Sequence, residues 1–154
     1  MTQPTTGDFQ QQVRLMQSIF AAMVLGPLVF ALVVLLVLPG EGAGDGPLTK
    51  IGLIGGFGAL CLSGPVGRVL RSRGATAGSP LGSFLTALIV SGAILEGGVF
   101  LNLLAHMQER SLWSLAMAAL LWTALLFKFP AETRVRSWLE KQELAIREAA
   151  AFRK

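Results

Sequence analysis

Four long runs of apolar residues alternate with short polar connections along the chain. The runs cover about residues 18–38, 51–66, 81–107 and 112–129, and the first contains no charged side chain. A helix that rises about 1.5 Å per residue needs roughly 20 apolar residues to cross a hydrocarbon core about 30 Å thick. The pattern therefore predicts an all-α protein, a bundle of four transmembrane helices.

The two ends of the chain are more polar than this membrane domain, which spans residues 18–129. Residues 1–17 are expected to form a short N-terminal segment and residues 130–154 a tail. Apolar tail residues recur near the helical period of 3.6, which predicts an amphipathic helix. These residues are Val135, Trp138, Leu139, Ala145, Ile146, Ala149 and Phe152. We expect this helix, and Trp138 in particular, to lie on the membrane surface; pairing with a partner helix is the alternative.

Composition supports the membrane assignment. Of the 154 residues 53% are apolar and 14% are charged, whereas a soluble domain has about a quarter of its residues charged. This balance argues against a disordered chain and most soluble enzymes, and the single cysteine argues against a disulfide framework.

The charged residues predict the orientation. The connection after the second run contains Arg68, Arg71 and Arg73 without an acidic residue, and the tail is also basic. We expect these three arginines to lie at the membrane surface. The connections at 39–48 and 108–111 are poor in basic residues. Since cytoplasmic loops collect Lys and Arg, both termini are expected in the cytoplasm. The same rule explains the net charge of +4, so no nucleic-acid partner is expected.

The first apolar run has a second interpretation, a cleavable secretory signal. Its length of about 21 residues exceeds the usual 7 to 15 of a signal core, which favours a retained span.

Small residues form two stripes on the second run. Gly52 and Gly56 lie one turn apart, and Gly55, Ala59 and Ser63 follow a four-residue spacing. Such faces let helix backbones approach closely in a bilayer. We favour helix packing over a backbone-lined pore, and expect Pro65 to kink or end this helix.

Glu96 stands near the middle of the third run. A charge at this depth costs about 2.5–3.5 kcal/mol, so the carboxyl group needs a partner or a proton. An intramembrane acid indicates a functional site, for proton or cation movement. The equally weighted alternative is a protonated carboxyl group that hydrogen-bonds a neighbouring helix.

Asn102 and His106 share a face of the same helix, because they are four residues apart. Together with Glu96 they are the candidate ion-pathway residues, although Asn102 also suits an interhelical hydrogen bond. A single histidine without further ligands does not suggest a metal site. We therefore expect no metal, no cofactor and, without a nucleophile and base, no enzyme.

The segment Ala93-Ile94-Leu95-Glu96-Gly97-Gly98-Val99-Phe100-Leu101-Asn102-Leu103 resembles one in small uncharacterised bacterial membrane proteins with four spans. Their Phe-Pro and Arg-Val pairs after the last span are similar to Phe129-Pro130 and Arg134-Val135. The resemblance covers the second half of the chain and brings no activity with it. In outline, the second and third runs are also similar to the hairpin of rotary ATP synthase proteolipids, without that family's regular glycine ladder.

These observations predict a multi-pass inner-membrane protein that acts as a structural or interaction component. Its partners are expected to be the lipid bilayer and either a second copy of the chain or another membrane protein. The alternative is proton or cation translocation through Glu96.

Overall fold

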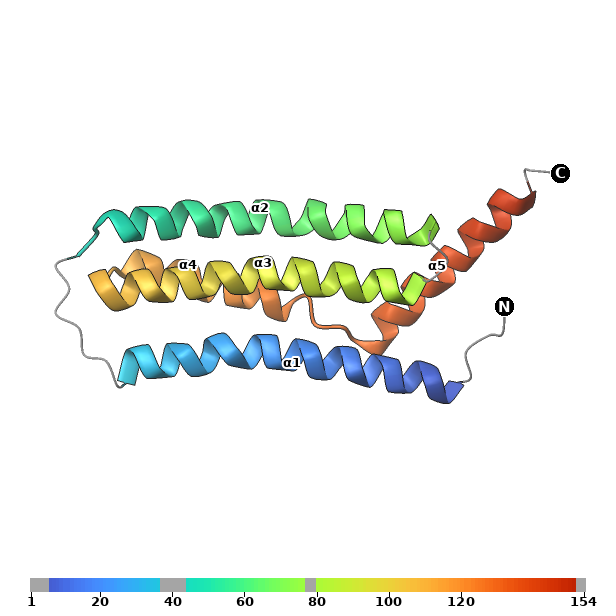
Figure 1. Cartoon of the computed structure of the whole chain (residues 1–154), viewed down its shortest axis with the longest axis horizontal. Helices are drawn as coiled ribbons and strands as arrows, with labels where there is room; N and C mark the ends of the chain where they lie inside the picture. The colour runs from blue at the N-terminus through green and yellow to red at the C-terminus, as the bar shows by residue number, and fades with distance from the viewer. Residues whose placement is uncertain (1–5, 37–43, 77–79, 152–154) are drawn as a thin grey trace.

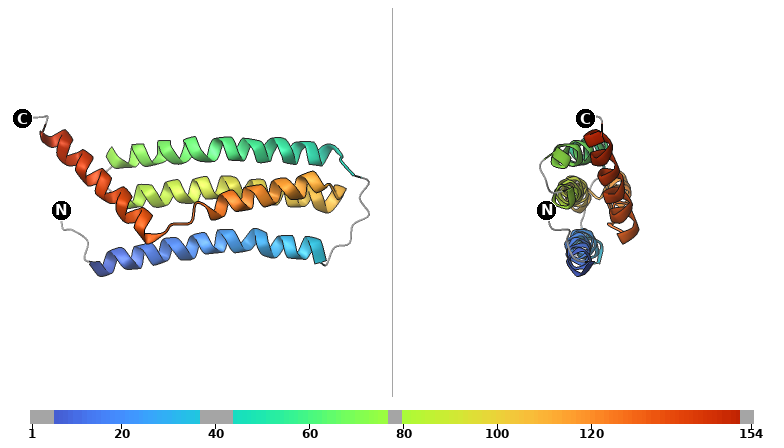
Figure 2. Two further views of the ribbon diagram at one scale, coloured as in Figure 1. Left: turned by 180° about the vertical axis from the view of Figure 1, so that it is seen from behind. Right: turned by 90° about the vertical axis from the view of Figure 1, so that its right-hand side faces the viewer.

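The chain folds into a bundle of helices. The computed structural model describes residues 6–36, 44–76 and 80–151, which contain no strand. The helices are α1 (Thr6–Leu36), α2 (Pro47–Thr76), α3 (Pro80–Glu109), α4 (Leu112–Leu126) and α5 (Glu132–Ala151). Helices α1, α2 and α3 lie side by side, α4 runs back along α3, and α5 leaves at an angle (Figures 1 and 2). The prediction of an all-helical bundle is confirmed.

Three helices are long and apolar enough to cross a membrane. Their apolar segments are Gln10–Leu36, Pro47–Ser72 and Gly82–Glu109. Helix α4 has 15 residues, which corresponds to a length of about 22 Å. The fourth span was expected to reach residue 129, but α4 ends at Leu126. Pro130 explains this end, because its ring clashes with the carbonyl group four residues earlier and offers no N–H to it.

Helix α2 continues through Pro65 to Thr76, so this proline does not end the helix. A proline inside a helix removes one main-chain hydrogen bond. The turns on either side are held by packing, since Ser63 and Gly67 are both buried and Gly67 faces the side chain of Ser91 on α3. Residues 37 and 38, the expected end of the first span, lie outside the described residues.

The largest buried cluster lies where the first four helices meet. It includes Phe20 of α1, Ala59 of α2, Leu95 and Leu103 of α3, and Leu121 of α4. In contrast, large apolar side chains of α1 and α2 remain exposed on the outside of the bundle, among them Leu25, Val29, Leu36, Ile54 and Phe57. Exposed apolar surface of this extent is typical of a protein that contacts lipid.

The start of helix α1 and the whole of α5 lie at the same end of the bundle, which we call the α5 end (Figure 1). Here Val135 of α5 is fully buried among Val13 and Met16 of α1 and Phe84 of α3. The ring of Trp138 packs on Phe84, with 5.2 Å between centroids. The first turns of the amphipathic tail helix therefore bury part of their apolar face against protein.

Candidate functional site

Glu96 lies on the flank of the bundle where α3 passes α1. A Cβ atom built on Gly26 of α1 would be 3.6 Å from its Oε1 atom, so the missing side chain at Gly26 leaves room for the carboxyl group. The Glu96 side chain is half-buried. No hydrogen bond or salt bridge joins it to another group in the part of the chain that the structure describes. The surface beside it bears exposed small residues, Ala22 and Gly26 on α1 and Ala93 and Gly97 on α3.

Asn102 occupies a different face of α3 and is fully buried against α2. Its Nδ2 atom donates to the carbonyl oxygen of Gly52 at 2.8 Å and to that of Gly98 at 2.9 Å. Its Oδ1 atom is buried without a hydrogen-bond partner among the described residues. The amide therefore ties α3 to the backbone of α2.

His106 lies further along α3 and is also buried. Its Nδ1 atom is 2.8 Å from the carbonyl oxygen of Ser111, at the turn into α4. Because a carbonyl oxygen only accepts, this contact favours the tautomer that has a proton on Nδ1. The histidine thus closes the turn between α3 and α4.

The structure does not gather the three predicted ion-pathway residues on one face. Successive helical residues are rotated by about 100°, so Glu96 and Asn102 point in directions about 120° apart. Asn102 faces Gly52 of α2 while Glu96 faces Gly26 of α1. The three side chains therefore do not line one face of α3, and Glu96 has no polar partner among the described residues.

The small residues of α2 lie at its contact with α3 and α4. Gly52, Gly56, Ala59 and Ser63 are buried, and Gly55 is half-buried. A Cβ atom at Gly52 would be 3.0 Å from Oδ1 of Asn102, and one at Gly55 would be 2.7 Å from Cδ2 of Leu101. The close approach of two helices that we expected from this stripe occurs between α2 and α3.

A polar network that was not predicted from the sequence lies at the end of the bundle opposite α5. The Glu109 carboxylate, at the end of α3, accepts hydrogen bonds from the N–H groups of Gly46, Leu48 and Thr49 at the start of α2, at 3.0, 2.8 and 2.7 Å. The first N–H groups of a helix lack main-chain partners, so a carboxylate there stabilises the helix start. The acidic residue beside a tight turn was the available signal, but nothing in the sequence indicated which helix it caps.

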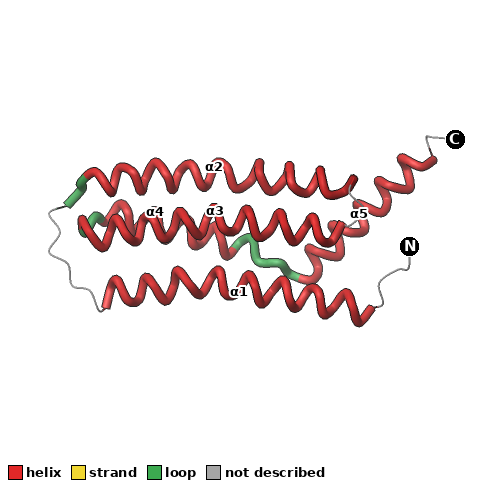
Figure 3. The backbone as a smooth tube through the Cα atoms, in the orientation of Figure 1, coloured by secondary structure: helices red, strands yellow, loops and turns green. Residues whose placement is uncertain are grey.

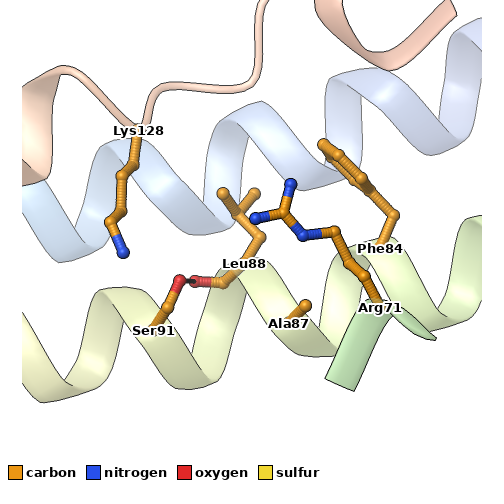
Figure 4. Close-up of a pocket in the computed structure, with 6 residues that line it drawn as sticks. All are labelled: Arg71, Phe84, Ala87, Leu88, Ser91 and Lys128. Atoms are coloured by element: carbon orange, nitrogen blue, oxygen red, sulfur yellow. Dashed lines mark hydrogen bonds between the residues drawn. The ribbon is translucent and has the colours of Figure 1, made fainter. Parts of the chain in front are cut away.

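The residues predicted to lie at the membrane surface differ in their exposure at the α5 end. Arg68 is exposed, whereas Arg71 is half-buried and lines a cavity; the side chain of Arg73 lies outside the described part. The cavity has a volume of about 120 Å³ and is also lined by Phe84, Ala87, Leu88, Ser91 and Lys128. In Figure 4, the Arg71 and Lys128 side chains enter it from different elements. The ring of Trp138 packs on Phe84, which is one of the residues that line the cavity.

A second cavity of about 160 Å³ is almost entirely apolar and opens between α1, α3 and α4. Its walls are Pro27, Leu28, Ala31, Val99, Leu103, Leu115, Ala118, Ala119 and Trp122. The indole Nε1 of Trp122 donates to the carbonyl oxygen of Val24 at 3.1 Å. This bond connects α4 to α1 beside the cavity.

Within the described ranges, no three His, Cys, Asp or Glu side chains gather in a way that would hold a metal ion. Comparisons of the chain with models of known families, with curated proteins and with solved structures found no match.

Proposed function

We propose that this protein is a four-span component of the inner membrane that assembles with further copies of itself through the flank around Glu96. The three long apolar helices support a location in the membrane. Helix α4, although short, runs antiparallel to α3 and returns the chain toward the α5 end (Figure 3). An even number of crossings places both termini on one side, and the basic residues near α5 favour the cytoplasm.

The observation behind assembly is the position of Glu96. It lies at the middle of the apolar segment Gly82–Glu109, half-exposed on the bundle surface and without a polar partner among the described residues. A polar group that faces hydrocarbon is costly unless it is hydrogen-bonded. Interhelical hydrogen bonds between polar side chains stabilise contacts between helices in membranes.

A second copy of the chain satisfies this group well. A protonated carboxyl group both donates and accepts, so two Glu96 side chains related by a two-fold axis can bond each other. The exposed pairs Ala22 and Gly26, and Ala93 and Gly97, have the four-residue spacing that allows close helix approach. The surface therefore combines a polar group that can pair with its own copy and small residues that allow two helices to approach closely.

The oligomeric state of the full chain tests this proposal. We expect single-molecule photobleaching in liposomes to show oligomers that persist at high lipid dilution. Gly97→Leu and Glu96→Leu should both shift the protein toward monomers. Gly58→Leu is the matched control, because Gly58 lies on α2 and a Cβ there meets nothing within 4 Å. A monomeric wild type at every dilution would refute the assembly.

Proton or cation translocation is the second candidate, favoured by the same mid-span carboxyl group. Because Asn102 and His106 face elsewhere, the pathway would depend on Glu96 alone. A pH-sensitive dye inside liposomes should then report flux in the wild type that Glu96→Gln abolishes. Absence of flux together with preserved oligomers would favour the structural role.

A further inference from the structure

The cavity at the α5 end brings together two cations that are far apart in the sequence. Arg71 lies in the last part of α2, whereas Lys128 follows the end of α4. Both line the cavity, and the apolar side chain of Leu88 lies between them (Figure 4). Ser91 lies near Lys128, and Phe84 lies on the other side of Arg71. No carboxylate is among the described residues that line it.

Each cation is held in place by one hydrogen bond to a helix carbonyl group. Nε of Arg71 donates to the oxygen of Gly67 at 3.0 Å, and Nζ of Lys128 donates to the oxygen of Ser63 at 3.1 Å. A guanidinium group has five N–H donors and an ammonium group has three. These two bonds therefore fix both side chains while leaving most of their donors for a ligand.

Among the described residues that line the cavity, no acidic side chain balances these two cations. Burial and, next, the positive charge of Arg71 lower the pKa of Lys128, which lies beyond the end of α4. An anion between the two side chains would attract both cations and so counteract the lowering of the Lys128 pKa. By contrast, Arg68 is exposed, as expected for a cation that only contacts the polar membrane surface.

We propose that this cavity binds a phosphate group, supplied by an anionic phospholipid or by free phosphate. Guanidinium groups match phosphate oxygens in pairs, and an ammonium group adds a compact charge. The volume of about 120 Å³ is several times the roughly 10–15 Å³ that a single water requires, so a polyatomic anion can enter. The apolar walls formed by Phe84 and Leu88 favour a phosphate attached to acyl chains.

Native mass spectrometry of the full chain in mild detergent tests this site, with phosphatidylglycerol as the probe. We expect Arg71→Gln combined with Lys128→Gln to weaken binding at least tenfold, because hydrogen bonds to charged groups are the strong ones. Arg68→Gln removes the same charge from the same helix outside the cavity and should change binding less than twofold. Lys128→Arg keeps the charge and should retain binding.

Three outcomes would overturn the proposal: absence of binding to the wild type, equal weakening by Arg68→Gln, or unchanged binding in the double variant. Circular dichroism checks that the double variant is folded. If it is not, the contrast between Lys128→Gln and Lys128→Arg provides the same test, and equal binding by these two variants would refute the site.

Two further probes identify the source of the phosphate. Diacylglycerol with the same acyl chains has no phosphate, and binding as tight as that of phosphatidylglycerol would overturn the proposal. Inorganic phosphate at millimolar concentration should not displace the lipid if the source is a headgroup. Displacement that the double variant abolishes would instead assign the site to free phosphate.

Discussion

Helix α3 has two contrasting neighbours. Against α2 it presents Asn102 and Gly98, and glycines of α2 meet it so closely that a Cβ at Gly56 would lie 2.9 Å from Nδ2 of Asn102. Against α1 it presents the ring of Phe100, which packs on Phe30 with 5.5 Å between centroids, and the half-exposed Glu96. One interface is close and hydrogen-bonded, and the other is formed by large side chains around an isolated carboxyl group.

The contrast shows what can hold helices together where lipid is the solvent. Lipid tails are as apolar as leucine, so close packing and interhelical hydrogen bonds provide most of the association energy. The α2–α3 contact has both, through Gly52, Gly56 and Asn102. The α1 side is secured at separate points, by Gln17 Nε2 to the oxygen of Pro130 at 3.2 Å and by Trp122 to Val24. We therefore expect α1 to be the helix that is more easily displaced.

Filling the close contact should have the largest effect. In Gly56→Val, the added atoms would start 2.7 Å from Cγ of Met117 and 2.9 Å from Nδ2 of Asn102. Overpacking of this kind costs typically 1–3 kcal/mol, and we expect a loss of about 3 kcal/mol in the free energy of unfolding. Titration with a denaturing detergent, followed by tryptophan fluorescence, measures it. Gly58→Val is the control, and a similar loss there would show that β-branching rather than contact is responsible.

Removing the polar link should have an intermediate effect. Asn102→Leu keeps a similar volume but abolishes the bonds to the oxygens of Gly52 and Gly98. Hydrogen bonds within membrane bundles are worth about 0.6–2 kcal/mol, so we expect a loss of about 1–2 kcal/mol in the same titration. Ser91→Ala removes a hydroxyl group whose hydrogen bond within the described part of the chain goes to the Leu88 oxygen of its own helix, and it should be nearly neutral. An unchanged free energy of unfolding in Asn102→Leu would mean that close packing of small residues alone stabilises the contact between α2 and α3.

Loosening α1 should have the smallest effect on global stability. Trp122→Phe removes the bond from the indole Nε1 to the oxygen of Val24, and we expect a loss of about 0.6 kcal/mol. Hydrogen-exchange mass spectrometry should show faster exchange in α1 peptides and unchanged exchange in α2. Equal acceleration in both helices would contradict the difference between the two interfaces.

The sequence predicted that each element is a helix more accurately than it predicted which other elements that helix contacts. The apolar runs foretold the long helices, and the small-residue stripe of α2 marked a face that the structure places against α3. The last apolar run extends to residue 129, whereas α4 ends at Leu126. Pro130 was the feature of the sequence that could have predicted this earlier end. The sequence did not indicate which group the Lys128 side chain meets, and in the structure its ammonium group donates to the oxygen of Ser63 on α2.

The candidate sites were only partly accessible to sequence reasoning. The mid-span position of Glu96 follows from counting residues along one helix. Its position beside Gly26, the meeting of Arg71 with Lys128, and the capping of α2 by Glu109 join residues that are remote in the chain. No local pattern records which distant residues meet.

The amino-acid sequence by itself determined that this chain is helical and mainly apolar, with segments long enough to cross a bilayer. Those properties depend on local hydrogen bonding and on the match between segment length and membrane thickness. Only the tertiary structure decided that Asn102 faces α2, that Glu96 faces α1 and that two cations share one cavity. The rotation of each helix about its axis depends on simultaneous packing against all its neighbours, and that packing is a property of the whole bundle.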